Sequence, residues 1–421
     1  MIMNFYIKCC ACNTKFRLRW QIGYPFVSVA FQCPSCNTNI SGFVQDKSHF
    51  EFVKEFKNGI DCLDEITNNF ADYVVEISSE FFTKKIKKDG ALDVSPFMRS
   101  SYVIKDNDYF NKVCQYGFKI KELKDNVSLI YSLFLNNKWD VLSKQLEKSN
   151  DIFVQSTKNK NKELYEKHNY FEFIHNYLKL HINFLCFESI YKRVCEIEQD
   201  IKSIYHLNKE SLEEFCNKLS EDKQFVLLEN KFKILLLDYM DLYRGLLPIY
   251  FKKDITTIDM NELGLSTNSI NDLLHFYKNA YEFLGEFIVI IIGLNNISTR
   301  GNANKFMNKE KDVFETINKI SSKVNRFNDY LKNGEIFTND FVGGLNNIIR
   351  NSEAHFDMFF DPITQKIIFK NKKENNVTVL EKYMLEFSKD VIDIFQKCII
   401  LWEISFQLQK KQMNYVLHYR K

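Results

Sequence analysis

The sequence predicts a mainly α-helical protein with a small β module at its N-terminus. The chain has 421 residues, of which only 13 are glycine and 5 are proline. So few turn-forming residues favour long uninterrupted elements, and helices are the simplest way to build them. Apolar residues recur every three or four positions over long segments after residue 49, which is the helical period. Residues 1–48 differ, because they hold two cysteine pairs and short strand-like runs.

Composition and charge indicate a folded protein of more than one domain. About 45% of the residues are hydrophobic, which excludes a disordered chain, and 421 residues favour two or three domains. The net charge of +3 means that any nucleic-acid-binding surface must be local. Residues 1–7 lack the features of a signal peptide. The apolar run 287–294 is too short to span a bilayer and is expected to belong to a buried core helix. We therefore expect a cytoplasmic protein without membrane association, whose scattered cysteines are reduced thiols.

Two Cys-x-x-Cys pairs near the N-terminus predict a metal site. The four ligands would be Cys9, Cys12, Cys33 and Cys36. Zinc prefers four tetrahedral ligands, and each Cys-x-x-Cys turn supplies two of them. The spacer is long enough for two strands, at 14–20 and 26–31. A chelate of Cys10 with Cys12 would be one residue too short, so residues 1–48 are interpreted as a zinc ribbon with a structural Zn²⁺.

Each cysteine pair is followed by the same dipeptide, Asn-Thr. Asn13 and Asn37 therefore occupy equivalent places, and asparagine tolerates the left-handed backbone that such knuckles often need. The simplest role for the ribbon is a metal staple or a protein contact. A nucleic-acid contact is the alternative, through Arg17 and Arg19 together with Lys8 and Lys15. The aromatic residues beside them, Trp20, Tyr24 and Phe26, could stack on bases.

Residues 49–253 are expected to form a helical middle region with a sensing or regulatory role. Helical periodicity is clearest at 110–136 and 170–205, and a long helix at 223–247 should end at Pro248. A group of three possible metal ligands, His168, Glu172 and His175, would share one helical face, but ordinary surface or core residues are the preferred interpretation.

Residues 254–421 are expected to form the third segment, a helical domain. A helix capped by Ser266, Thr267 or Ser269 should run to residue 294, and a second should span 308–331. A third should begin near residue 339 and lead to Arg350. A hairpin-like excursion is expected at 356–380 and a last long helix at 381–413.

The stretch Arg350-Asn351-Ser352-Glu353-Ala354-His355 lies in this helical setting. It resembles the signature of the HEPN superfamily, an Arg, usually a polar residue such as Asn, and then a His four to six positions after the Arg. The resemblance covers the chain from about Ser266 to Lys421 and implies a helical bundle. It also implies a metal-independent endoribonuclease, of a kind that often acts as a toxin or antiviral defence effector.

The chemistry of these side chains fits such a reaction. The 2′-OH of RNA attacks the adjacent phosphorus and leaves a 2′,3′-cyclic phosphate, which requires proton transfer and a cation. His355 can transfer a proton at cellular pH, Arg350 can clamp phosphate oxygens, and Asn351 can orient the imidazole or the phosphate. No metal is needed for this catalysis.

The spacing adds a constraint. Five residues along an ideal helix rotate by about 140° net, so Arg350 and His355 would not share a face. Either the helix ends inside the motif or the working site is composite. The resemblance implies a homodimer with two facing motifs, and the alternative is a partner chain that completes the site. An antitoxin or a phage-derived trigger is a further expected partner.

A basic run follows the motif and could contact the RNA backbone. It consists of Lys366, Lys370, Lys372 and Lys373, although a solvated hairpin is the simpler interpretation. The rival hypothesis from another class is a non-catalytic HEPN scaffold that binds a nucleotide or a partner, with a ribbon that binds nucleic acid. A third hypothesis is a zinc-ribbon factor of transcription or translation.

Overall fold

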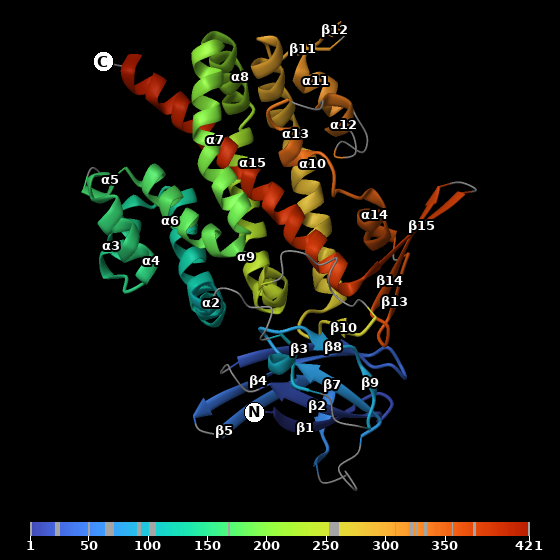
Figure 1. The fold of residues 1–421 in the computed structure, drawn as a ribbon. Helices are drawn as coiled ribbons and strands as arrows, with labels where there is room; N and C mark the ends of the chain where they lie inside the picture. The colour runs from blue at the N-terminus through green and yellow to red at the C-terminus, as the bar shows by residue number, and fades with distance from the viewer. Residues whose placement is uncertain are drawn as a thin grey trace. The chain divides into compact units, whose positions relative to one another are not determined.

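The computed structural model describes most of the chain, and Figure 1 shows its elements. The described residues are 2–21, 26–48, 51–63, 71–90, 94–100, 107–166, 169–251, 261–307, 309–319, 324, 327–331, 335–355, 357–373 and 376–419. Within these ranges the side chains of 48, 100, 107, 309, 328, 353–355, 372–373, 376 and 413–419 are not described.

The chain divides into two compact units, each assembled from three separated stretches. Unit 1 contains Met1–Lys121, Met240–Phe276 and Ile348–Val391, and unit 2 contains Glu122–Tyr239, Tyr277–Asn347 and Ile392–Lys421. These units cut across the three segments expected from the sequence, 1–48, 49–253 and 254–421. Long helices cause this division, because four of them contribute one end to each unit.

Two β-sheets form the N-terminal part of unit 1. One has the order β6-β1-β2-β7-β9, and the other has the order β3-β4-β5. Their bounds are β1 Ile2–Cys9, β2 Lys15–Gln21, β3 Phe26–Gln32, β4 Asn39–Ser48, β5 Glu51–Lys57, β6 Gly59–Asp61, β7 Tyr73–Ile77 and β9 Lys87–Lys88. Both sheets contribute to one apolar core, in which Phe16 lies edge-on to Phe31 with ring centroids 5.1 Å apart.

The expected strands of the ribbon are confirmed, but the expected start of helical structure at residue 49 is wrong. Strands β5 to β9 lie between residues 51 and 88. The reason is non-local pairing, since β7 adds in parallel to β2, with Leu18 opposite Val75. Parallel pairing requires a long crossover connection, and a short strand of this kind has no local signal that identifies its partner.

The remaining elements of unit 1 come from distant parts of the chain. They are β8 (Thr83–Lys84), α1 (Pro96–Ser100), β10 (Leu263–Gly264), α14 (Asn347–His355), β13 (Met358–Asp361), β14 (Lys366–Lys373) and β15 (Asn376–Tyr383). Strands β13, β14 and β15 form an antiparallel sheet in that order. The expected hairpin at 356–380 is therefore confirmed and gains a third strand. Gln365 ties this sheet to Leu265 through two hydrogen bonds of 2.7 and 3.0 Å.

Unit 2 is helical. Its shorter elements are α3 (Trp139–Lys148), α4 (Ile152–Lys160), α5 (Lys162–Glu166), α6 (Tyr170–Leu185), α7 (Glu188–Leu207), α8 (Lys209–Glu221), β11 (Lys305–Phe306), β12 (Lys309–Glu310), α11 (Val313–Asn318), α12 (Phe327–Tyr330) and α13 (Thr338–Phe341). The helices shared by the two units are α2 (Asn107–Leu135), α9 (Gln224–Phe251), α10 (Ile270–Arg300) and α15 (Met384–Tyr419). The structure therefore confirms a mainly helical chain with a small N-terminal β region.

Several expected helix boundaries differ. Pro248 stands inside α9 and does not end it, because the buried side chains of Leu247, Ile249 and Tyr250 keep the last turn packed. Ser269 caps α10 through a 3.2 Å hydrogen bond to the amide of Asn271. Helix α10 continues to Arg300, past the expected end at residue 294.

The expected helix at 308–331 is broken in the structure. In the described part of this range only α11 and α12 are α-helical, and β12 precedes them. The helix expected from residue 339 to Arg350 is two helices, α13 and α14. Gly343 and Gly344 separate them with φ values of 83° and 71°, a conformation that ends a helix.

Helix α10 is long and apolar enough to cross a membrane by length and composition alone. In its most apolar window, 83% of the residues are buried inside the structure. The expectation that residues 287–294 form a buried core helix therefore agrees with their burial.

Candidate functional site

The two cysteine knuckles bring four thiols together. Cys9 and Cys12 lie at the turn between β1 and β2, and Cys33 and Cys36 lie at the turn between β3 and β4. The four sulfur atoms lie within 4.8 Å of one another. The Cys9 and Cys36 sulfurs are 3.7 Å apart, and those of Cys12 and Cys33 are 3.5 Å apart.

The two knuckles have the same backbone geometry. The amide of Asn13 donates to the carbonyl of Cys9 at 3.0 Å, and the amide of Asn37 donates to that of Cys33 at 2.8 Å. Both asparagines have a left-handed backbone, with φ values of 61° and 58°. The prediction of equivalent knuckles with left-handed asparagines is therefore confirmed, and this geometry holds each cysteine pair on one side of the site.

The donor set fits a metal ion such as zinc. Four sulfurs at about 2.3 Å from one centre in a tetrahedron would lie roughly 3.8 Å from each other, close to the observed spacings. Burial raises the pKa of Cys33 to about 12, whereas hydrogen bonds with Thr38 lower the pKa of Cys36 to about 6. Cys10 does not belong to this set, because it is exposed and its sulfur lies 3.8 Å from Asn58 Oδ1, outside the cluster.

The two arginines expected to contact nucleic acid are buried in unit 1. Arg17 is 7% exposed and pairs with Asp89, and Arg19 is 8% exposed and donates to Glu76 at 3.0 Å. Trp20, expected as a stacking residue, is also buried. The prediction of Arg17 and Arg19 as a nucleic-acid contact is therefore wrong. Side chains along β2 alternate between the two faces of the strand, but neither face is exposed. The second sheet covers one face, and acidic partners cover the arginines on the other.

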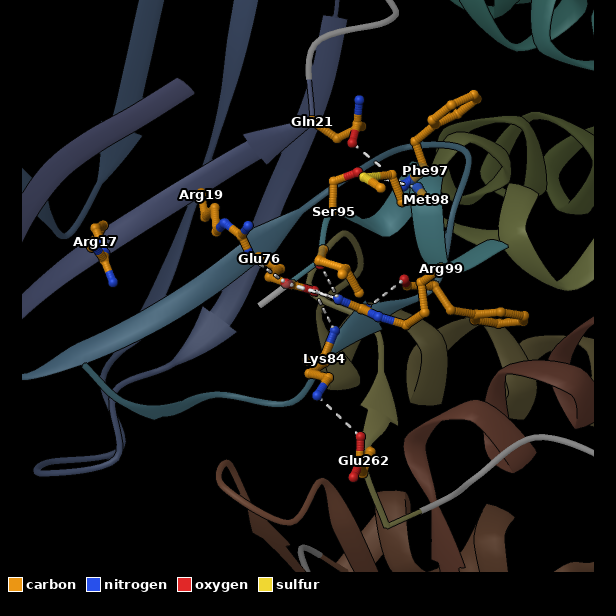
Figure 2. Close-up of polar contacts among 12 residues, drawn as sticks. Arg17, Arg19, Gln21, Glu76, Lys84, Ser95, Phe97, Met98, Arg99 and Glu262 are labelled. Atoms are coloured by element: carbon orange, nitrogen blue, oxygen red, sulfur yellow. Dashed lines mark hydrogen bonds and ion pairs between the residues drawn. The ribbon is translucent and has the colours of Figure 1, made fainter. Parts of the chain in front are cut away.

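Glu76 is the centre of this buried network (Figure 2). Its carboxylate accepts hydrogen bonds from Arg19 and from both terminal nitrogens of Arg99, each at 3.0 Å, and from the amide of Lys84 at 2.8 Å. Strand β7 thus carries one carboxylate that joins β2, α1 and β8. The network is structural, because the carboxylate of Glu76 already accepts from the guanidinium groups of Arg19 and Arg99.

The Arg–His motif lies on α14, which remains helical from Asn347 to His355. Arg350 is partly buried and donates from Nη1 to Asn351 Oδ1 at 3.1 Å. The side-chain nitrogen of Asn351, Nδ2, in turn donates to Asn371 Oδ1 on β14 at 3.5 Å. His355 is the last residue of α14, and its side chain lies outside the described residues.

The helix continues to the last residue of the motif, so the first geometric alternative, a helix that ends between Arg350 and His355, does not apply. Positions 350 and 355 are separated by about 140° around α14, and positions 351 and 355 share a face. The buried Ser352 hydroxyl lies 2.7 Å from the carbonyl of Ile348 and 2.9 Å from that of Lys370. These contacts attach the middle of α14 to β14.

The lysines of β14 divide between the two faces of its sheet. Lys366, Lys370 and Lys372 occupy alternate positions and share one face, whereas Lys373 falls with Asn371 on the other. Lys366 pairs with Glu381 at 2.6 Å, and Lys370 is exposed. The side chains of Lys372 and Lys373 lie outside the described residues. By position, Lys373 therefore lies on the same face of the sheet as Asn371, which accepts a hydrogen bond from Asn351 of the motif.

Two of the three possible metal ligands of the middle region have other partners in the structure. His175 is buried, its Nε2 lies 2.8 Å from Glu403 Oε2, and its ring stacks on Phe406. Glu172 instead pairs with Lys410 at 3.1 Å. His168 lies outside the described residues. Among the described residues, the cysteine cluster is the one group of three or more ligands that could hold a metal ion.

Comparisons with known proteins do not place the chain in a family. No protein-family model, no curated protein and no solved structure matches it.

Sequence reasoning missed a buried carboxylate in unit 2. Glu229 accepts hydrogen bonds from Tyr131 and from Trp402 Nε1, the latter at 3.3 Å. A signal for it was present, because Glu229 lies four positions after Phe225 and three before Phe232, on the apolar stripe of α9. A lone acidic residue on such a stripe indicates a buried carboxylate with a specific role.

Proposed function

We propose that this protein is a metal-independent endoribonuclease of the HEPN type, which leaves 2′,3′-cyclic phosphate ends. The observation that carries the proposal is the place of the motif on one continuous helix. Arg350 and Asn351 are joined by a hydrogen bond there, and His355 lies one turn after Asn351. The helix adds a requirement for a second chain, because Arg350 and His355 occupy different sides of one α14 and cannot both face the same substrate.

Arg350 would neutralise the charge that develops on the phosphate. Its Nη1 atom is held by Asn351 Oδ1 at 3.1 Å, and Asn351 is held by Asn371. A guanidinium fixed in this way loses less side-chain entropy when it binds a phosphate. Asn351 is thus a positioning residue for Arg350, which refines the expectation that it orients the imidazole.

His355 would transfer the protons, taking one from the 2′-OH and giving one to the leaving 5′ oxygen. Since positions 350 and 355 are about 140° apart on α14, the active site would combine residues of two chains. We propose a homodimer in which Arg350 of one chain and His355 of its partner face the same phosphate.

The cysteine cluster would hold a structural zinc ion. Its sulfurs have the spacing that Zn²⁺ prefers, and two of its cysteines, Cys9 and Cys33, belong to the apolar core of the two sheets. The metal would then stabilise unit 1 and take no part in RNA cleavage. The exposed Lys370 is a candidate contact for the RNA backbone, with Lys372 and Lys373 as further candidates.

The test is RNA cleavage by the purified protein, with and without EDTA, on tRNA and on single-stranded RNA. We expect cyclic phosphate ends from the wild type in both buffers and none from His355→Ala or Arg350→Ala. His206→Ala is the matched control, because His206 is exposed on α7 and far from the motif in sequence. Arg350→Lys keeps the charge but loses the two-nitrogen fork, so we expect a large loss of rate.

The homodimer makes a sharper prediction. An equal mixture of Arg350→Ala and His355→Ala chains, each inactive alone, should recover about one quarter of the wild-type activity. About half of the dimers would be mixed, and each mixed dimer holds one intact composite site of its two. Growth arrest on expression, lost in both variants, would support a role as a toxin or defence effector. Binding of RNA without cleavage by any form would favour the alternative, a non-catalytic scaffold.

A further inference from the structure

A cleft of about 1010 Å³ opens in unit 2, away from the cysteine cluster and the α14 motif in sequence. It is formed by the end of α2, by α3 and by the start of α6. Helix α9 adds Val226 and Glu229, and helix α15 adds Gln409. Clefts of this size, aromatic with a few polar groups, are typical of small-molecule sites.

One wall of the cleft is aromatic. Trp139 stacks on Tyr170 with ring centroids 6.2 Å apart and planes 15° apart, and Phe134 meets Trp139 edge-on at 5.8 Å. Trp139 is 42% exposed, whereas Tyr170 is buried behind it. A tryptophan held rigidly by its neighbours with a free face offers the strongest of the aromatic surfaces for a cation.

The buried polar group of the cleft is Glu229, which is 8% exposed. Tyr131 and Trp402 both donate to the same oxygen, Oε2. Gln409 also hydrogen bonds to the carboxylate. A carboxylate has about four acceptor sites, so roughly one is left for a further donor. Burial raises the pKa of Glu229 to about 7, and a bound cation would stabilise its charged form.

The charges of the cleft favour a cationic ligand. Three carboxylates line it, those of Asp140, Glu147 and Glu229, against the single ammonium of Lys144. A phosphate-bearing ligand would be repelled by this balance, whereas a cation is attracted by the carboxylates and by the ring faces. The unfilled acceptor of Glu229 further favours a cation that carries an N–H donor.

We propose that this cleft binds a small organic cation with an N–H donor, an alkyl ammonium or guanidinium group. An N–H of its cationic group contacts Glu229, and its positive charge lies over the ring of Trp139. The site is independent of the proposed RNA cleavage, because it shares no residue with α14 or with the cysteine cluster.

The probe is agmatine, which carries an ammonium and a guanidinium group, titrated into the full chain by calorimetry. Butylurea is the uncharged control of similar shape, and adenosine monophosphate is the anionic aromatic control. We expect saturable binding of agmatine and at least about tenfold weaker binding of both controls, because only agmatine has the charge that the cleft selects.

Variants then locate the binding site. Glu229→Gln keeps the size of the side chain and removes its charge, and we expect roughly tenfold weaker binding of agmatine. At the exposed wall, Trp139→Phe should keep most of the affinity and Trp139→Leu should lose roughly tenfold. Glu210→Gln, an exposed position on α8 outside the cleft, is the control and should leave the affinity unchanged.

Folding is followed for each variant by thermal denaturation, and Trp139→Leu keeps the test decisive if Glu229→Gln does not fold. The proposal is overturned if agmatine shows no binding at concentrations up to about 10 mM, which is weaker than any specific site of this size should be. It is also overturned if butylurea or adenosine monophosphate binds as tightly as agmatine. Equal affinities for Trp139→Phe and Trp139→Leu would likewise contradict it.

Discussion

Asn13 and Asn37 occupy the same position in the two cysteine knuckles, and both have a left-handed backbone, with φ values of 61° and 58°. Each follows the second cysteine of its pair and donates its amide to the carbonyl of the first. Their equivalence explains why the chain repeats the dipeptide Asn-Thr after each pair. It also means that the two positions tolerate few residue types.

Replacement of Asn37 should therefore depend on backbone conformation. Asn37→Gly should be nearly neutral, whereas Asn37→Val should lower the free energy of unfolding by about 1–2 kcal/mol, because a β-branched residue is strained in the left-handed region. Urea denaturation of the metal-loaded protein measures the difference. Asn39→Val is the control, since Asn39 lies in strand β4, where a β-branched residue fits. Equal losses at positions 37 and 39 would contradict this explanation.

The metal-binding prediction separates the four cluster cysteines from their exposed neighbour. Cys33→Ser should abolish stoichiometric zinc binding and unfold the two N-terminal sheets, because Cys33 is part of their core. Cys10→Ser should retain one zinc ion per chain and the wild-type melting temperature. The measurement is metal content by elemental analysis beside thermal denaturation. Loss of zinc in Cys10→Ser would show that the ligand set is different.

The knuckles could be predicted from sequence because every signal is local. The Cys-x-x-Cys spacings, the left-handed asparagines and two short strands all lie between Cys9 and Thr38. The surroundings of Arg17 and Arg19 could not be predicted in this way. Their partners, Asp89 and Glu76, lie far along the chain, and only the parallel pairing of β2 with β7 brings the second pair together.

The candidate motif shows the same division between local and non-local information. The helical setting of Arg350 was predictable, and so were two strands of the sheet that follows. The break between α13 and α14 was also present in the sequence as Gly343-Gly344, a signal that periodicity alone overlooks. In contrast, the contact between Asn351 and Asn371 depends on how β14 packs beside α14, which local patterns do not specify.

The buried network around Glu76 predicts a large loss of stability when its carboxylate is removed. Glu76→Ala would leave Arg19 and Arg99 buried without their shared partner, and breaking such a group costs about 3–5 kcal/mol. Urea denaturation followed by circular dichroism measures this loss. Glu188→Ala, which removes an exposed i,i+4 pair with Lys192, is the control and should have no measurable effect. If the free energy of unfolding falls as little as in the control, Arg19 and Arg99 must hydrogen bond to water or to other acceptors in the variant.

Glu80 predicts how stability depends on pH. This side chain is 3% exposed, Ser78 Oγ donates to it at 3.1 Å, and burial raises its pKa to about 8. The folded state then binds more protons than the unfolded state between about pH 4.5 and pH 8, so Glu80 lowers the free energy of unfolding as pH rises through this window. The full effect is on the order of 5 kcal/mol above pH 8.

Glu80→Gln should remove this dependence, because glutamine fills the same space without ionising. Relative to the wild type, the variant should gain stability as pH rises from about 5 to about 9, measured as the difference between the two urea midpoints at each pH. Taking the difference also cancels the contribution of Glu229, whose raised pKa acts in the same direction in both proteins. Glu55→Gln, an exposed change on β5, should show no such trend. If the difference stays constant with pH, Glu80 is ionised in the folded protein and a cation or water must reach it.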